Sequence, residues 1–137
     1  MIADDVAYFL ALHAIGIVAT DLFAGRMPDQ PDVCMVIAET GGRDPLMVMG
    51  SDTINVERPG FQVHIRDTSY AAGEARAYAV FALLEGITEA PLVSGTPSGA
   101  TYKLIHASQS PHHIGLDDQQ RHLWVQNFSV LWENPDR

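Results

Sequence analysis

Apolar and polar positions alternate along the middle of the chain, where residues 57–66 read Glu-Arg-Pro-Gly-Phe-Gln-Val-His-Ile-Arg. Apolar residues occupy every second position here and polar ones stand between them: Phe61, Val63 and Ile65 against Gln62, His64 and Arg66. A period of two is typical of a strand with one buried side and one solvated side. We therefore expect an amphipathic strand in this segment.

The apolar period changes to that of a helix directly after this strand. Between Ser69 and Gly86, apolar residues recur three and four positions apart: Ala71, Ala75, Tyr78, Ala79, Ala82 and Leu83. This spacing predicts a helix that packs along this stripe and ends at Gly86. Ser69, or Thr68 beside it, is the expected cap, because a hydroxyl oxygen can accept a hydrogen bond from a first-turn amide.

A further helix is expected at the start of the chain. Residues 2–14 place five residues on one stripe, namely Ile2, Val6, Phe9, Leu10 and His13. Gly16 follows as the expected stop signal. A short extended segment at 20–23 and a proline-rich turn at 26–32 are expected next.

A buried strand follows the turn. Residues 33–40 are apolar on both faces as far as Glu39, which predicts a strand covered on both sides and central in the sheet. Gly41-Gly42 is expected to end this strand, because glycine weakens a strand interior. We expect a long loop or hairpin at 43–56.

The last third of the chain predicts two more strands. Residues 89–100 are rich in glycine, proline and serine and predict a loop, and 102–107 predict a strand. Residues 108–120 predict a polar excursion between this strand and a final strand at 121–132. Four large apolar residues share one face of the final strand, with Gln126 as a polar interruption: Trp124, Phe128, Val130 and Trp132.

The order of these elements predicts an α+β fold. We expect a mainly antiparallel, or mixed, sheet of four to five strands with two helices packed on one face. A chain of 137 residues is long enough to bury roughly two-thirds of its unfolded surface in one core. We therefore expect a single domain over residues 1–137.

Charge and composition narrow the functional classes. Eight basic and 17 acidic residues give a formal net charge of −9, which repels duplex DNA, although a channel through which DNA slides would favour this sign. Cys34 is the single cysteine, so an internal disulfide is excluded. The apolar run from Val6 to Thr20 is shorter than the about 20 residues that span a membrane, so we expect no membrane contact and synthesis in the cytoplasm.

One stretch gathers side chains that could carry chemistry: His106, His112, His113, Asp117, Asp118 and His122. Imidazole and carboxylate groups could bind zinc or act as acid and base. The adjacent His112 and His113 diverge in an extended segment, however, and no helical H-x-x-x-H or C-x-x-C motif supports them. We expect a polar hairpin loop here, with no bound metal, no cofactor and no enzymatic activity. A small metal-dependent enzyme that uses this stretch is the alternative.

Three residues are candidates for a subunit interface: Arg66, Trp124 and Trp132. Arg66 ends the polar face of its strand and could pair with Glu57 or Glu74, or reach a neighbouring subunit. The two tryptophans fit a core position and a subunit contact equally, because aromatic residues are enriched at subunit contacts as well as in cores.

Several short motifs follow one another in a particular order: Phe23–Pro28, Val36–Gly42, Pro59–Arg66, the alanine-spaced helix after Ser69, Gly115–Asp117 and Trp124–Val130. Together they resemble the tail terminator, or minor capsid, proteins of long-tailed bacteriophages. The resemblance implies a structural virion protein without catalytic residues. Such subunits close into a ring, usually a hexamer, at the head-proximal end of the tail tube.

The resemblance also implies partners and a location. The ring would stop growth of the tail tube and join the tail to the head connector, so its expected partners are further copies of the chain, the tail tube protein and a head-completion or connector protein. DNA would pass through without specific binding. The expected location is the tail-to-head junction of the virion, after assembly in the host cytoplasm. Another neck or head-completion protein of the same virion is the alternative within this class.

Overall fold

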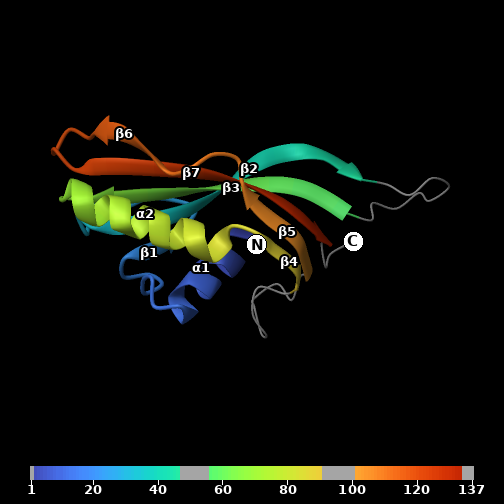
Figure 1. The fold of residues 1–137 in the computed structure, drawn as a ribbon. Coiled ribbons are helices and arrows are strands. Elements are labelled where there is room, and N and C mark those ends of the chain that lie inside the picture. The colour runs from blue at the N-terminus through green and yellow to red at the C-terminus, as the bar shows by residue number, and fades with distance from the viewer. Residues whose placement is uncertain (1, 47–55, 91–100, 134–137) are drawn as a thin grey trace.

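The described part of the chain, residues 2–46, 56–90 and 101–133 of a computed structural model, forms one sheet and two helices (Figure 1). The elements run in this order: α1 (Ile2–Leu12), β1 (Leu22–Ala24), β2 (Cys34–Leu46), β3 (Val56–Asp67), α2 (Tyr70–Leu84), β4 (Ile87–Ala90), β5 (Thr101–Ala107), β6 (His112–Leu116) and β7 (His122–Glu133). The predicted α+β class is confirmed. Both predicted strands of the last third, β5 and β7, agree with their predicted bounds to within one residue.

The sheet is larger than the sequence predicts. Within the described residues it has seven strands in the order β1-β2-β3-β7-β5-β4, and β6 also pairs with β7. The β1–β2 pair is parallel, and the other strand pairs are antiparallel. The prediction of four to five strands was too low because β6 and the second half of β4 lie in segments that had been expected to form loops. Each of these short strands is held by pairing with a longer neighbour, β5 or β7.

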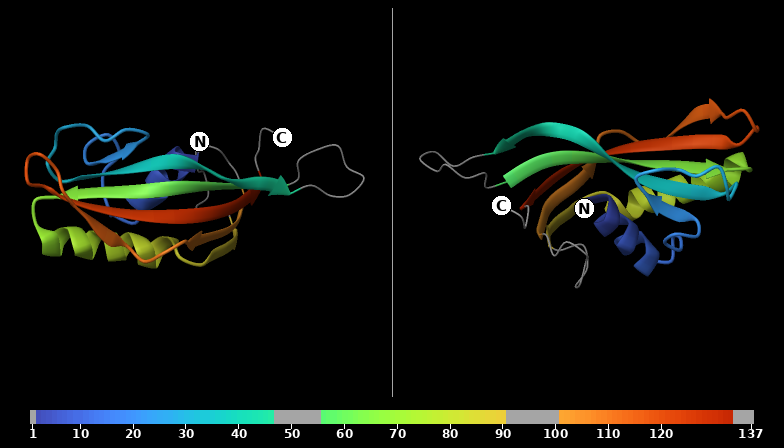
Figure 2. Two further views of the ribbon diagram at one scale, coloured as in Figure 1. Left: turned by 90° about the horizontal axis from the view of Figure 1, so that it is seen from above. Right: turned by 180° about the vertical axis from the view of Figure 1, so that it is seen from behind.

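Both helices cover the same face of the curved sheet, as predicted (Figures 1 and 2). Helix α1 packs on β1 and β2, whereas α2 packs on β3, β5 and β7. Side chains from both helices and from these strands form one buried cluster. The amphipathic strand behaves as expected, since Phe61, Val63 and Ile65 of β3 all belong to this cluster. Within the described residues, no helix is long and apolar enough to cross a membrane.

Helix α2 has nearly the predicted bounds but buries a different face. Ser69 is its N-cap and accepts a hydrogen bond from the amide of Ala72 at 3.3 Å, as predicted. The predicted stripe is exposed or half-buried, and the face toward the sheet consists of Gly73, Ala77, Val80 and Leu84. A Cβ atom at position 73 would lie 2.8 Å from Nε1 of Trp124, so glycine is what lets the indole approach the helix. The expected packing stripe was therefore wrong.

Helix α1 ends earlier than expected and without the predicted glycine. Its last residue is Leu12, and Ala14 takes the left-handed conformation with φ of 61°. The amide of Ile15 donates to the carbonyl of Leu10 at 3.0 Å, and the amide of Ala14 donates to that of Ala11 at 3.1 Å. These two bonds define a Schellman end, in which glycine is the usual residue at the position of Ala14.

The double glycine does not end β2. The strand continues to Leu46, with an irregular register between Thr40 and Arg43. Gly42 has φ of 73°, and a Cβ atom there would overlap the carbonyl oxygen of Arg58, so the pair forms a bulge that only glycine fits. As predicted, the first part of β2 is buried on both faces and lies between two neighbouring strands. The remainder of the two predicted loops, at 47–55 and 91–100, lies outside the described residues.

Candidate functional site

The face of the sheet away from the helices carries a segment that a buried arginine holds in place. Arg66 of β3 is 4% exposed and lies on the opposite face from Ile65. Its Nη2 donates to the carbonyl oxygens of three residues at 2.8, 3.1 and 2.6 Å, in the order Pro28, Asp29 and Pro31. Its Nε donates to the carbonyl of Asp32 at 3.2 Å. The predicted turn at 26–32 is thus an ordered segment bound through its backbone.

A second buried arginine holds the same segment through side chains. Arg121 precedes β7, and its guanidinium forms ion pairs with Asp117 at 2.7 Å, Asp32 at 3.2 Å and Asp29 at 3.3 Å. It also donates to the carbonyl oxygen of Asp29 at 2.7 Å. Together, Arg66 and Arg121 connect β3, the start of β7 and residues 28–32.

The ionisation of this cluster follows from its hydrogen bonds. Desolvation acts to raise the pKa of Asp117, but bonds from the amide and guanidinium of Arg121 and from the amide of Gln119 outweigh it. The pKa of Asp117 therefore lies below its usual value. Desolvation acts to lower the pKa of Arg121, and its bonds to Asp117 and Asp29 raise it above the usual value. The carboxylates of this cluster form ion pairs with Arg121, so the cluster is a structural anchor that holds these segments together.

Cys34 pairs with Arg66 across β2 and β3 and is fully buried. Burial raises the pKa of its thiol, and the positive charges of Arg66 and Arg121 offset this only in part. A buried thiol with a raised pKa is a poor nucleophile. Cys34 therefore acts as a small buried hydrophobe.

The histidine-rich stretch is not the polar hairpin loop that we expected. It contains β6, where His112 is exposed and His113 is half-buried, so the two side chains diverge as an extended segment requires. Nε2 of His113 lies 3.0 Å from Nδ1 of His122 on β7. Both rings pack against Tyr70 at the start of α2, with centroids 5.1 and 5.6 Å away.

This histidine pair is part of an aromatic cluster. His113 and Tyr70 each lie about 5 Å from the indole of Trp124, at 5.2 and 5.1 Å. Within the described ranges, no three His, Cys, Asp or Glu side chains gather as a metal site would require. The absence of bound metal remains a prediction. The aromatic cluster joins β6, β7 and α2.

The three predicted interface residues are buried within the single subunit. Arg66, Trp124 and Trp132 are all less than 5% exposed. Nε1 of Trp132 donates to Glu57 at 3.2 Å, and its ring lies 5.4 Å from that of Tyr102. Side chains this buried can serve an interface only through the residues that they position. Their role in an interface stays a prediction.

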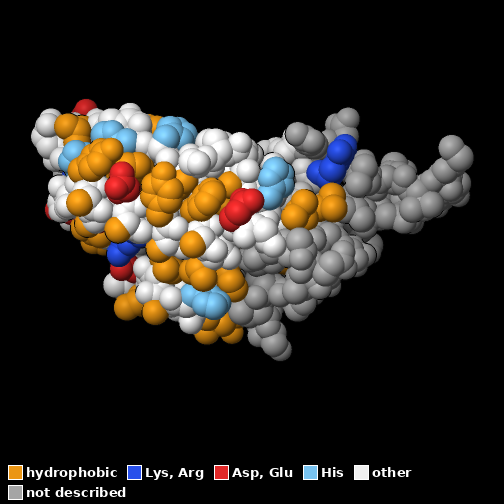
Figure 3. Space-filling model, viewed as in Figure 1, with side chains coloured by type: hydrophobic (Ala, Val, Ile, Leu, Met, Phe, Trp, Pro, Cys, Tyr) orange, Lys and Arg blue, Asp and Glu red, His pale blue; other side chains and the backbone are white. Residues whose placement is uncertain are grey.

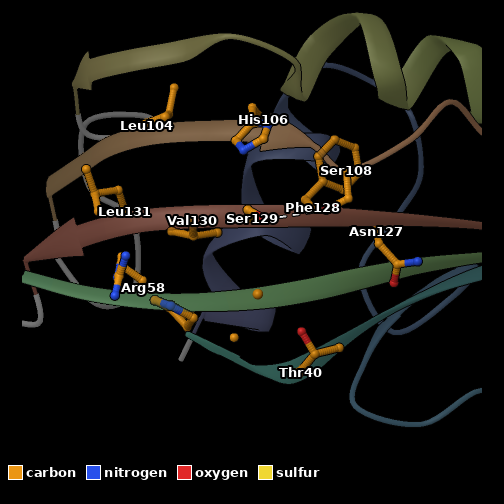
Figure 4. A pocket seen from close by; sticks show the side chains of 13 residues that line it. Thr40, Arg58, Leu104, His106, Ser108, Asn127, Phe128, Ser129, Val130 and Leu131 are labelled. Atoms are coloured by element: carbon orange, nitrogen blue, oxygen red, sulfur yellow. Dashed lines mark hydrogen bonds between the residues drawn. The ribbon is translucent and has the colours of Figure 1, made fainter. Parts of the chain in front are cut away.

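A shallow hollow of about 250 Å³ lies on the face of the sheet away from α1 (Figure 4). Its side chains come from four strands, β2, β3, β5 and β7, and mix hydroxyl, amide, imidazole, guanidinium and aliphatic groups. The labelled residues include Thr40, Arg58, His106, Asn127 and Leu131 (Figure 4). This hollow could not be predicted from local sequence patterns, because its residues come together only through strand pairing.

Comparison with known proteins agrees with this picture of a structural subunit. The sequence pattern of the family described as bacteriophage tail terminator protein matches residues 9–134, which is nearly the whole chain. No curated protein matches the chain. The family match includes the end of α1, the whole of α2 and every strand described above. The chain therefore belongs to the bacteriophage tail terminator protein family.

Proposed function

We propose that this chain forms a ring, most simply a hexamer, that caps the tail tube, stops its polymerisation and joins the tail to the head connector. The family match over residues 9–134 is the observation that carries this proposal. The proposed partners are further copies of the chain, the tail tube protein and a head-completion or connector protein. The whole chain would act as one domain at the tail-to-head junction, after assembly in the host cytoplasm.

The use of the polar groups supports a structural role. Asp117 and the two other aspartates of the Arg121 cluster bind a guanidinium, and the His113–His122 pair packs among aromatic rings. Each of these groups holds elements of the subunit together. This arrangement suits a subunit whose function is to present surfaces.

The long strands supply a candidate contact for an axial partner. Strands β2 and β3 pair as far as Leu46 and Val56 and project together beyond the part of the sheet that the helices cover (Figures 1 and 2). A projecting two-stranded arm can reach a partner above or below a ring. We assign this arm to contact with the tail tube protein or the connector.

The negative charge suits a ring around moving DNA. Each copy carries a formal charge of −9, and a lining of this sign would not hold phosphate groups through counterion release. DNA would then pass through the ring without specific binding.

Tail length in the absence of this chain tests the proposal. Phage that lack the chain should produce tails without a fixed length and without attached heads, and expression of the chain from a plasmid should restore normal virions. Electron microscopy of the lysates measures both properties. A plasmid without the coding sequence is the control, and it should leave the defect unchanged. Tails of normal length joined to heads in the absence of the chain would overturn the proposal.

A further inference from the structure

Helix α2 presents to solvent a face that its sequence would suit for burial. Tyr70 and Tyr78 are 48% and 47% exposed, and Ala71, Ala72 and Ala75 are exposed as well. Hydrophobic side chains are common on the part of the surface that lies over α2 (Figure 3). Glu74 and Arg76 are the charged residues among the 15 of this helix. A helix that is apolar on all sides normally has protein on all sides. We call the side chains of Tyr70, Glu74, Ala75 and Tyr78 the α2 surface.

The two tyrosines are suited to an interface. The ring of Tyr70 packs against His113, His122 and Trp124, so its exposed edge is held in one place. Tyr78 lies two turns further along the helix, and its ring lies 6.2 Å from that of Phe81. Tyrosine is enriched at interfaces because it offers a large apolar contact at a low cost in side-chain entropy.

A second apolar surface follows the end of α1. Leu12, Ile17 and Val18 are 57%, 64% and 50% exposed. The segment 12–20 contains no Asp, Glu, Lys or Arg. Backbone bonds fix its shape, because the amides of Thr20, Asp21 and Leu22 all donate to the carbonyl of Ile17. We call Leu12, Ile17, Val18 and Thr20 the α1-end surface.

The two surfaces lie on opposite sides of the subunit. Helix α1 and its following segment pack at the β1–β2 end of the sheet, whereas α2 packs on β3, β5 and β7. The left view of Figure 2 shows α2 along one border and residues 12–24 along the other, with the strands between them. A subunit with two different contact surfaces on opposite sides can associate head to tail, and such contacts close into a ring when the rotation permits.

We propose that the α2 surface of one copy docks on the α1-end surface of the next copy, and that this contact is the subunit interface of the ring. The inference rests on the proposed ring and assigns its interface.

The local charges of the two surfaces, unlike the net charge, fit a second copy as the occupant. Copies that each carry −9 repel one another, so they can approach only where few acidic groups meet. The α1-end surface has no charge, and Arg26, which is exposed, follows the neighbouring strand β1. The α2 surface carries the acidic Glu74. The opposite signs of Glu74 and Arg26 would steer the two surfaces together in this one orientation.

Crosslinking of two cysteine variants tests the assignment directly. Ala75→Cys places a thiol on the α2 surface and Thr20→Cys places one on the α1-end surface, and both positions are exposed. The variants are mixed, concentrated and treated with a short bis-maleimide, and the same treatment is applied to virions assembled with both chains. We expect a link between residue 75 of one copy and residue 20 of another in the mixture. Each variant alone should give no crosslinked dimer, neither 75 to 75 nor 20 to 20. The unmodified chain is a control, because Cys34 is fully buried.

A substitution pair provides a second readout. Tyr78→Asp should weaken self-association at least about tenfold, as loss of a central aromatic contact does. Ile114→Asp changes a side chain of similar exposure, 50%, that lies on β6 outside both surfaces, and it should leave association unchanged. Thermal unfolding shows that both variants are folded. Exchange of charges in Glu74→Arg with Arg26→Glu should retain more association than either change alone.

The outcomes separate the interface from the ring. Links of 75 to 75, or a ring without any 75-to-20 link, would overturn the interface assignment and leave the ring in place. A 75-to-20 link together with loss of association in Tyr78→Asp supports the assignment. Equal loss in Ile114→Asp would overturn it, because the effect would then be one of charge alone. If neither the concentrated protein nor the virions contain an oligomer, the ring itself is overturned.

Discussion

Replacement of Tyr102 by phenylalanine removes one hydroxyl that ties the start of the chain to β5. Oη of Tyr102 donates to Oδ2 of Asp5 on α1 at 2.6 Å, and both residues are fully buried. Removal of one partner of a buried hydrogen bond costs about 1–3 kcal/mol, because it leaves a desolvated acceptor without that partner. The ring of Tyr102 and its contact with Trp132 remain in the variant. We therefore expect the free energy of unfolding to fall by about 2 kcal/mol.

Urea denaturation of dilute protein measures this change. The midpoint should fall while the slope with urea stays constant, since the surface exposed on unfolding is unchanged. Tyr78→Phe removes a hydroxyl from an exposed ring and should change stability by less than about 0.5 kcal/mol. A double-mutant cycle with Asp5→Ala isolates the bond, because Asp5 has further interactions. A loss below about 0.5 kcal/mol in Tyr102→Phe, or a cycle without coupling, would refute the reasoning.

Three further predictions concern the anchor, the core and DNA. The stabilisation from Asp117 is complete above the usual aspartate pKa of 3.8 and is lost as the pH falls through the lowered pKa of the folded state. The stability difference between the unmodified chain and Asp117→Asn should therefore shrink in acid. A difference that stays constant with pH would contradict this. Gln126 is 1% exposed, and within the described residues its amide has no hydrogen-bond partner. Gln126→Met should therefore raise the free energy of unfolding by about 1–2 kcal/mol. A fall in the free energy of unfolding would mean that the amide is hydrogen-bonded. Anisotropy titration at about 150 mM salt should show no affinity for duplex DNA, and micromolar binding that weakens with added salt would reveal a basic surface.

Local signals in the sequence were sufficient to predict the extent of most elements. The cap at Ser69 and the change of period placed α2 almost correctly, and the alternation around Phe61 gave both faces of β3. The buried face of α2 could not be predicted in the same way, because the helix has apolar residues of its own on every side. That choice depends on Gly73 meeting Trp124, which is 51 positions away in the chain (124 minus 73).

The candidate site was less accessible to prediction for the same reason. Nothing within residues 28–32 indicates that their carbonyl oxygens meet Arg66, since the partners are 34 or more positions apart. Strand β6 has a weak apolar pattern and forms through pairing with β7. The turn at 26–32 was predicted from its local composition alone, and its Asp29 and Asp32 pair with the distant Arg121.

The position of this chain in the virion tests the central claim most directly. Cryo-electron microscopy of intact virions, with the structure fitted to the neck density, would locate every copy. We expect one ring of this chain between the last ring of tail tube protein and the head connector, with α2 of each copy facing the α1-end surface of its neighbour. Density for the chain along the tail tube, in the capsid shell or nowhere in the virion would contradict the proposed tail terminator function.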